Sequence, residues 1–281
     1  LPVPYFLVTF TLPAQLRALA RRHPQRLYAQ FFRSSAMALQ QLAADPRFVG
    51  GQIGMIGVLQ TWTRDLRYHP HIHYLVPAGG FAPVAGLWRP AKGQVLVHVK
   101  PLSKLFQGKM RAGLRQLRLD AGVPQTVWST PWVVDCRAVG SGAAALKYLA
   151  PYIFRVALSN NRLERVVDDQ VTFRYRDADS KQTKRCTLSA EAFIRRFLQH
   201  VVPKGFVKVR YYGLFSPAKR PLLAQVRTLL EEVANGAPGD AATPITADAA
   251  EERVARIYAC PSCGATMECT QVLVPSSRSP P

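Results

Sequence analysis

Apolar and polar residues alternate in several short stretches of the chain, and this period of two predicts β-strands. The first stretch, PYFLVTFTLP at residues 4–13, is rich in β-branched and aromatic residues and closes at a proline. Residues around 171–188 (VTFRYRD and KRCTL) are expected to form a hairpin. Further strands are predicted at 51–63, 71–80, 131–136 and 206–213.

Other stretches repeat their apolar residues with the period of a helix. Residues 101–122 show this most clearly, because apolar side chains lie on one side of the predicted helix and basic side chains on another. Ser189 stands where the N-cap of a helix over 189–201 belongs. Strands and helices in this mixture, with short turns between neighbouring strands, predict an α+β fold. Further helices are predicted at 14–44, interrupted at His23-Pro24, at 140–157 and at 217–234.

The composition changes near residue 234 and divides the chain into three parts. Residues 1–234 carry all of the predicted elements above and form the main domain. Residues 235–252 (NGAPGDAATPITADAAEE) are rich in Gly, Pro and Ala, as linkers often are. Residues 253–281 form a short tail with the sequence CPSCG and a Ser- and Pro-rich end.

The charge of the chain points to a polyanionic partner. Its formal net charge is +20 at pH 7 and its pI is about 10.3. Residues 1–230 hold 34 of the 37 basic residues but only 10 of the 17 acidic residues, so the positive surface belongs to the main domain. Such an excess favours nucleic acid first and an anionic membrane surface second.

Cysteine usage and hydropathy indicate the compartment. No stretch is long and apolar enough for a transmembrane helix, and the N-terminus lacks a signal-peptide pattern. Five scattered cysteines do not make a disulfide framework, so we expect a cytoplasmic protein. The chain starts at Leu1, within a few residues of a predicted strand, so we expect it to be the remainder of a longer protein.

Three of the six histidines lie within five positions, in RYHPHIHYLVPAGG at 67–80. Side chains alternate along a strand, so His71 and His73 are expected on one side and Ile72 on the other, in the core. His69 is expected at the entrance of the strand. Two neighbouring imidazoles supply part of a metal site, and a further ligand must come from elsewhere. The alternative is that these are surface histidines of a basic nucleic-acid binder.

Tyr148 and Tyr152, in KYLAPYIFR, are four residues apart and share one face of a helix. A phenol is a poor nucleophile at neutral pH, but beside a divalent cation it can attack a phosphate and form a covalent ester with the DNA end. The alternative is an aromatic stripe that packs in the core. Pro151 is expected to kink the helix or to restart it.

An H-hydrophobic-H strand, followed by a helix with paired tyrosines in a basic chain, resembles the HUH endonuclease superfamily. Four ordered motifs more closely resemble the two-tyrosine rolling-circle transposases of bacterial insertion sequences. They are PVPYFLVTFTLPAQLR, LQTWTRDLRYHPHIHYLVPAGG, ALKYLAPYIFRVALSNNR and RYRDADSKQTKRCTLSAEAFIRRFLQHVVPKGFVKVRYYG. This resemblance implies a palm-like central antiparallel sheet, with the histidines mid-sheet and the tyrosine helix beside them.

The resemblance implies that His71 and His73 are metal ligands and that Tyr148 and Tyr152 are the nucleophiles. Gln60, on the preceding strand, is the candidate third ligand. The rivals are Asn160 and Asn161, just past the tyrosine helix. The cation would be Mg²⁺ or Mn²⁺, and with two imidazoles Mn²⁺ should work at least as well as Mg²⁺.

The implied reaction is a transesterification that leaves a 5′-phosphotyrosine and a free 3′-OH and needs no ATP. Relatives usually begin with a cysteine-rich zinc-binding segment before the first strand. We find none, and therefore expect a truncated or decayed copy. Residues 1–234 would then be the catalytic domain of a bacterial, nucleoid-associated enzyme.

Single-stranded DNA is the expected partner, because cations follow phosphates and aromatic rings stack on bases. The segments FRYRD and VRYYG fit this role. An ordinary solvated face is the alternative for the basic side of the helix at 101–122. The DNA-binding candidates on that helix are Lys104, Arg111, Arg115 and Arg118.

The tail carries Cys260 and Cys263, half of a zinc-ribbon signature, and only Cys269 follows them. A remnant that binds nothing is favoured over a zinc site completed by another chain or by a lost segment. Cys136 and Cys186 are expected to be buried strand residues.

The sequence therefore predicts a transposase that nicks and joins single strands by a rolling-circle route. Three alternatives stay open. A plasmid replication initiator or a relaxase would use the same chemistry on other DNA. A catalytically inactive palm would bind single-stranded nucleic acid only. A metal-storage or structural metalloprotein is the third.

Overall fold

The protein was analysed as a computed structural model, which describes residues 1–93, 95–154, 157–177, 180–234, 258–259 and 266–267. Within helix α5 (Gly142–Phe154), the side chains of residues 148–149 and 151–154 lie outside this description. The chain divides into two compact units, Leu1–Ile245 and Thr246–Pro281. In the second unit, strands β11 (Tyr258–Ala259) and β12 (Thr266–Met267) pair antiparallel. The predicted linker at 235–252 falls outside the described residues.

A five-stranded antiparallel sheet forms the centre of the first unit, in the order β10-β2-β3-β1-β6. Its register places Thr9 opposite His73 on one side of β3, and Gln60 opposite His71 on the other. The predicted α+β fold with a central antiparallel sheet is confirmed. The strands are β1 (Tyr5–Thr11), β2 (Gly54–Trp62), β3 (Tyr68–Pro77), β6 (Val134–Gly140) and β10 (Val209–Gly213).

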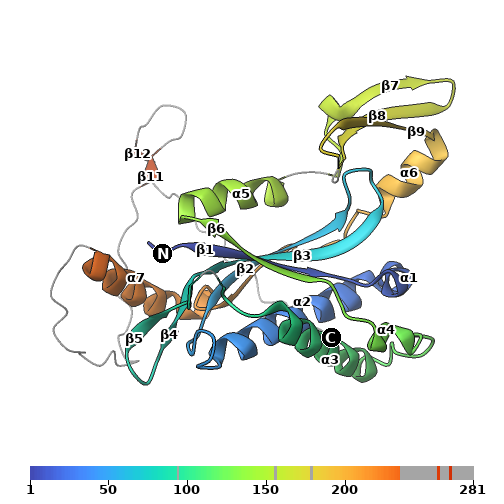
Figure 1. The fold of residues 1–281 in the computed structure, drawn as a ribbon. Coiled ribbons are helices and arrows are strands. Elements are labelled where there is room, and N and C mark those ends of the chain that lie inside the picture. Colours follow the sequence, from blue (N-terminus) through green and yellow to red (C-terminus); the bar gives the residue numbers. More distant parts are fainter. Residues whose placement is uncertain (94, 155–156, 178–179, 235–257, 260–265, 268–281) are drawn as a thin grey trace. The chain divides into compact units, whose positions relative to one another are not determined.

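Helices α1 (Arg17–Arg22), α2 (Pro24–Ala44) and α3 (Val99–Gln116) cover one face of this sheet (Figure 1). Alternate sheet residues such as Phe10, Ile72 and Tyr74 are fully buried against them. The packing is close. A Cβ on Gly57 of β2 would lie 2.6 Å from the Tyr74 ring, so the glycine is required there by the ring. The short η1 (Ala14–Leu16) precedes α1, and α4 (Thr126–Ser129) follows α3.

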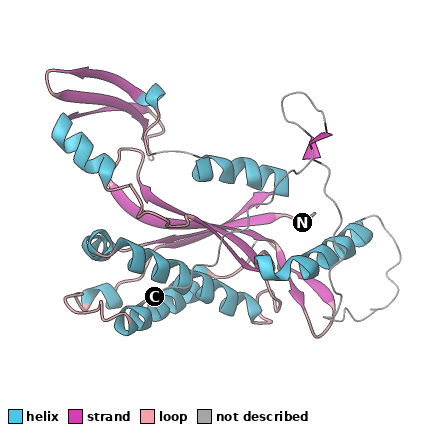
Figure 2. Ribbon diagram, turned by 180° about the vertical axis from the view of Figure 1, so that it is seen from behind, coloured by secondary structure: helices cyan, strands magenta, loops and turns pink. Residues whose placement is uncertain are grey.

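Helix α5 lies across the opposite face, as both ribbon views show (Figures 1 and 2). Ala145 of this helix is completely buried with Tyr5, Val58 and Leu75 from three neighbouring strands. A third cluster joins α7 (Arg220–Ala234) to the hairpin of β4 (Gly79–Ala82) and β5 (Leu87–Pro90), and the short η3 (Pro217–Lys219) precedes α7. None of the described helices has the length and apolarity needed to cross a membrane.

A smaller three-stranded sheet, β7-β8-β9, carries helix α6 (Ala190–Leu198). The predicted cap is present, because the Ser189 hydroxyl accepts the Ala192 N–H at 3.2 Å. Phe173 is fully buried with Leu66 of the β2–β3 turn, which joins this sheet to the central one. The strands are β7 (Leu163–Val167), β8 (Gln170–Arg176) and β9 (Thr183–Ser189), and η2 (Asn160–Arg162) precedes them.

The structure corrects several boundaries. The strand predicted at 131–136 begins at Val134, where pairing with Phe10 begins, and extends to Gly140. The helix predicted at 101–122 runs from Val99 to Gln116, because Arg118 just beyond it takes a left-handed backbone with φ of 53°. In the first unit the alternation missed three strands, β4, β5 and β7. β4 and β5 are only four residues long, too short for a clear period of two. β7 is exposed along its whole length, so its residues do not alternate between buried and exposed.

Candidate active site

The three histidines of β3 form a row on the face of the sheet that α5 covers. Ring centroids are 5.5 Å apart for His69 and His71, and 4.8 Å apart for His71 and His73. Ile72 points to the other face and is fully buried in the core. The predicted alternation along this strand is therefore confirmed. His69 lies inside β3, next to its first residue, Tyr68.

Hydrogen bonds fix the orientation of the two central rings. The Nδ1 of His71 is 2.7 Å from the carbonyl oxygen of His69, so Nδ1–H is the donor. The Nε2 of the same ring lies 3.1 Å from Oε1 of Gln60. On the other side, Nδ1 of His73 is 2.9 Å from the hydroxyl of Thr9. The cross-strand register thus supplies one polar partner to each imidazole.

These imidazoles are neutral near pH 7. Burial lowers the pKa of His73 to about 3, and electrostatic interactions with His71 and Arg137 act in the same direction. Burial likewise lowers the pKa of His69 to about 4. The pKa of His71 is lowered by burial and raised in part by its bond to the His69 carbonyl. Neutral imidazole is the form that binds a cation.

The donor chemistry of Gln60, His71 and His73 fits a divalent cation. With its proton on Nδ1, neutral His71 presents a lone pair at Nε2, which faces the amide oxygen of Gln60, a second acceptor. These two acceptors do not bind each other directly. A cation between them would interact with both, and rotation of the Gln60 amide would instead turn its NH₂ group toward Nε2. Among the described residues no group of three His, Cys, Asp or Glu side chains is placed to hold a metal ion. A site here would therefore need a ligand of another kind, and the amide oxygen of Gln60 lies next to His71.

The rival ligands are placed differently. Asn160 and Asn161 are exposed in η2, and the carbonyl of Asn161 accepts a bond from Arg174 of the smaller sheet. Only Gln60 among the three candidates has a recorded contact with His71 in the described part of the chain. The assignment of Gln60, His71 and His73 as ligands stays a prediction.

Tyr148 and Tyr152 belong to α5, whose backbone crosses the histidine face of the sheet. The positions of their side chains lie outside the described residues. Leu75, which packs with Ala145 of α5, lies on the same side of β3 as His71 and His73, because residues two apart share a face. The nucleophile assignment stays a prediction.

The predicted DNA-binding residues Lys104, Arg111 and Arg115 lie on α3, which covers the face opposite the histidines, and Arg118 follows that helix. The Arg111 guanidinium lies 5.6 Å from the centre of the Trp128 ring. Arg115 is 4.0 Å from the carboxylate of Asp120. Their contact with DNA stays a prediction, and the geometry separates them from the histidine row.

The cysteines complete the set of predicted residues. Cys260 and Cys263 fall outside the described residues. Cys136 and Cys186 are strand residues as predicted, in β6 and β9, but they are half-buried rather than buried. Both strands lie at the edge of their sheets, which leaves one side less covered.

Two residues near the site escaped the sequence patterns. Thr9 sits in an apolar strand and gave no signal, because its role depends on pairing with His73 across 64 positions. Arg17 Nη2 donates to Nδ1 of His69 at 2.7 Å, although a helix carries the one residue and a strand the other. The general excess of arginine was the only hint of this contact.

Comparison with known proteins gives the family. The family model described as "Putative transposase" (Y2_Tnp) matches residues 54–221, more than half of the chain. The chain belongs to this transposase family. The match includes Gln60, the histidine row, both tyrosines and β10.

Relatives agree with membership of the transposase family. The "Putative transposase y4qJ" of Sinorhizobium fredii is 37% identical over 92% of this chain and 71% of its own length. The "Transposase for insertion sequence element IS801" of Pseudomonas savastanoi pv. phaseolicola is 26% identical over 69% of this chain. The chain spans about half (52%) of that relative. No solved structure matches.

Proposed function

We propose that this transposase-family chain nicks and joins single-stranded DNA of an insertion sequence through a 5′-phosphotyrosine, in a rolling-circle route. One observation carries the proposal: Gln60, His71 and His73 meet on the face of the sheet that α5, the helix of Tyr148 and Tyr152, covers. Family membership favours a transposase over a replication initiator or a relaxase.

The spacing of the two elements supports this pairing. Ala145 packs in one cluster with Leu75, and from there the helix and the strand can be followed together. Along α5, Tyr148 and Tyr152 lie ~4.5 Å and ~10.5 Å from Ala145 at a helical rise of ~1.5 Å per residue. Along β3, His73 and His71 lie ~7 Å and ~13 Å from Leu75 at ~3.3 Å per residue. The proposal places these turns of α5 over the stretch of β3 that carries the imidazoles.

The residues of this chain would share the work as follows. Gln60, His71 and His73 would hold Mg²⁺ or Mn²⁺, which when bound withdraws charge from the scissile phosphate. Thr9 and the His69 carbonyl keep the two rings oriented, as outer partners of metal-binding histidines do. A phenolic oxygen of α5 attacks phosphorus from the side opposite the leaving oxygen.

The attack is balanced without an external energy source. A tyrosine Oη–P bond forms and the P–O3′ bond breaks. The phenol loses one proton and the departing 3′ oxygen gains one. A phosphodiester is exchanged for a phosphodiester, so the reverse reaction by a 3′-OH can rejoin DNA, and a second phenol allows a second strand to be held.

The test is a covalent complex with single-stranded oligonucleotides that tile the DNA on both sides of this gene, in Mn²⁺. An oligonucleotide labelled at its 3′ end should give a labelled protein band, and one labelled at its 5′ end should give a shortened product. The Tyr148→Phe/Tyr152→Phe double variant and EDTA should abolish both. Tyr211→Phe, at an exposed tyrosine of β10, is the matched control: it removes a phenol but keeps the aromatic ring that could stack on a base, so both products should be kept.

Binding of the oligonucleotides without a band under any of these conditions would contradict the proposal. It would leave a protein that binds single-stranded DNA and does not cut it. A band that survives in the double variant would assign the attack to another nucleophile.

A further inference from the structure

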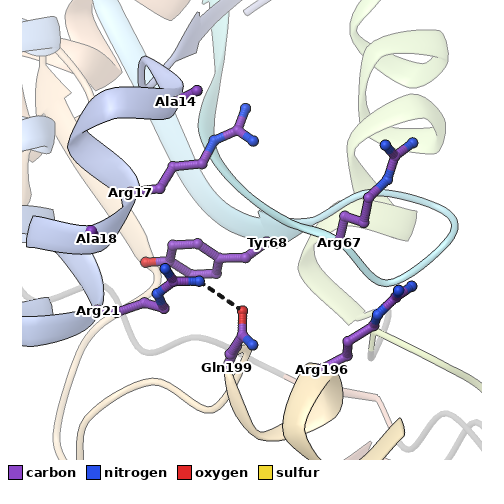
Figure 3. Close-up of a pocket in the computed structure, with 8 residues that line it drawn as sticks. All are labelled: Ala14, Arg17, Ala18, Arg21, Arg67, Tyr68, Arg196 and Gln199. Atoms are coloured by element: carbon purple, nitrogen blue, oxygen red, sulfur yellow. Dashed lines mark hydrogen bonds between the residues drawn. The ribbon is translucent and has the colours of Figure 1, made fainter. Parts of the chain in front are cut away.

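A second site is built beside the histidine row, from elements that are far apart in the sequence. A cavity of about 350 Å³ opens between α1, the β2–β3 turn and the end of α6 (Figure 3). Arg17 and Arg21 extend into it from α1, Arg67 from the turn and Arg196 from α6. The remaining lining residues are Ala14, Ala18, Tyr68 and Gln199.

The arginines of this cavity carry little compensating charge. In the described part of the chain, the single ion pair that involves any of the four is Arg67–Asp65, at 2.6 Å. The Nε of Arg17 is buried and has no hydrogen-bond partner among the described residues. Burial and the neighbouring charge of Arg67 lower the pKa of Arg17. A bound anion would accept a hydrogen bond from Nε of Arg17 and would offset the positive charge of the arginines.

Neutral side chains hold the guanidinium groups in place. The Tyr68 hydroxyl is hydrogen-bonded to that of Tyr28, and this fixes the ring over which Arg21 lies, at 5.5 Å from its centre. Arg21 also donates to Oε1 of Gln199 at 3.4 Å, the dashed line in Figure 3. Because these contacts leave most guanidinium N–H groups unused, the arginines stay able to bind oxygen atoms in pairs.

Arg17, which lines this cavity, also contacts the histidine row. Arg17 donates to His69 at 2.7 Å, and the His69 ring is 5.5 Å from that of His71. We propose that this pocket binds a backbone phosphate of the single-stranded DNA, next to the phosphate that is cut. This inference rests on the proposed function for the identity of the substrate.

Phosphate is the group that fits. Planar guanidinium groups match the oxygens of a phosphodiester, and several of them disperse its charge. Tyr68 is buried, with 6% of its surface exposed, and is covered by Arg21, so it is not a platform for stacking a base. The contact is therefore independent of base sequence and fixes the position of the strand relative to the histidines.

The experiment compares two double variants by fluorescence anisotropy, with a labelled thymidine oligonucleotide, in EDTA and over a range of salt. Arg21→Gln/Arg196→Gln removes two pocket arginines. Arg22→Gln/Arg195→Gln removes their sequence neighbours on the same two helices, which lie outside the pocket and are exposed. Melting temperatures of both variants confirm that the fold is kept.

The pocket variant should bind about tenfold more weakly at low salt, since it loses hydrogen bonds to a charged group. The slope of log K against log salt should also fall by about 0.7 for one lost phosphate contact. The neighbour variant should show a smaller loss of affinity and an unchanged slope. Equal effects in the two variants, or no effect in either, would overturn the pocket.

The result of this binding experiment can be distinguished from the result of the covalent-complex test of the proposed function. Binding in EDTA involves neither a cation nor a tyrosine ester, so the pocket can be supported even where no covalent band forms. Conversely, a covalent band in the unaltered protein, together with equal affinities for both double variants, would keep the nickase and remove the phosphate pocket.

Discussion

His71 is oriented by the backbone carbonyl of His69, two residues before it on the same strand. This bond places the ring proton on Nδ1 and leaves Nε2 facing the amide of Gln60. An amide oxygen is neutral, so a cation at this position would be held by weaker electrostatic attraction than a carboxylate gives. We therefore expect a site in which the imidazoles favour Mn²⁺ over Mg²⁺.

At the residue scale, Gln60→Ala tests whether Gln60 is a metal ligand. Loss of the amide oxygen should weaken Mn²⁺ binding by at least about 10- to 100-fold, because loss of a mere outer partner of a metal ligand already costs that much. Titration of the protein with Mn²⁺, followed by electron paramagnetic resonance, measures the affinity. Gln41→Ala, at an exposed position of α2, should leave it unchanged. Equal affinities for all three proteins would exclude Gln60 as a ligand.

At the scale of elements, the two faces of β3 pack against different helices. Ile72 and Tyr74 pack against α2 and α3, whereas Leu75 packs against α5 and His71 and His73 line the same face. The depth at which α5 sits on the sheet is set by a small residue, Ala145, which has no exposed surface. Any catalytic role of the α5 tyrosines depends on this close contact.

Ala145→Leu should therefore disturb both stability and activity. The larger side chain has to push α5 away from Tyr5 and Val58, which should lower the free energy of unfolding by about 1–3 kcal/mol. It should also reduce the yield of the covalent DNA complex. Urea unfolding and the labelled-band assay measure the two effects.

Ala144→Leu provides the matched control, because Ala144 is exposed one position earlier on the same helix. It should change the stability by about 0.5 kcal/mol or less. The same loss of stability in both variants would contradict the close packing of α5 on the sheet.

At the scale of the whole molecule, a strongly basic chain keeps several histidines neutral by burial. The pKa values of His69, His71, His73 and His200 are all lowered, with burial as the largest cause in each case. In the unfolded chain these groups would titrate near their ordinary value of 6.5. Folding therefore releases protons at mildly acidic pH.

The free energy of unfolding should consequently fall as pH falls from about 6.5 toward 4. In this range the unfolded chain binds protons that the folded chain does not, so stability rises with pH. For His73 the window extends to its folded pKa of about 3. Each such histidine contributes up to ~1.4 kcal/mol per pH unit. Urea unfolding at a series of pH values measures the slope.

His200→Gln should make this slope shallower by removing one titrating group whose pKa is lowered by burial. A stability that is flat or rising as pH falls from 6.5 would show that these rings are protonated in the folded protein.

Much of the site was predictable because its determinants are local. Alternation along a strand is a property of the backbone, so HPHIH already placed His71 and His73 together and Ile72 in the core. Gln60 was predicted from the strand just before, and the short turn between β2 and β3 brings it into register with His71. The α+β class followed from the same periodicities.

The remaining features required the tertiary structure, because they depend on which elements become neighbours. The pairing of Thr9 with His73, and the position of α3 on the face away from the histidines, come from strand order and helix packing. The arginine pocket joins residues 17, 67 and 196, which no periodicity links. Sequence determined which chemical groups share a strand or a helix, and packing of the apolar faces decided which strands and helices meet.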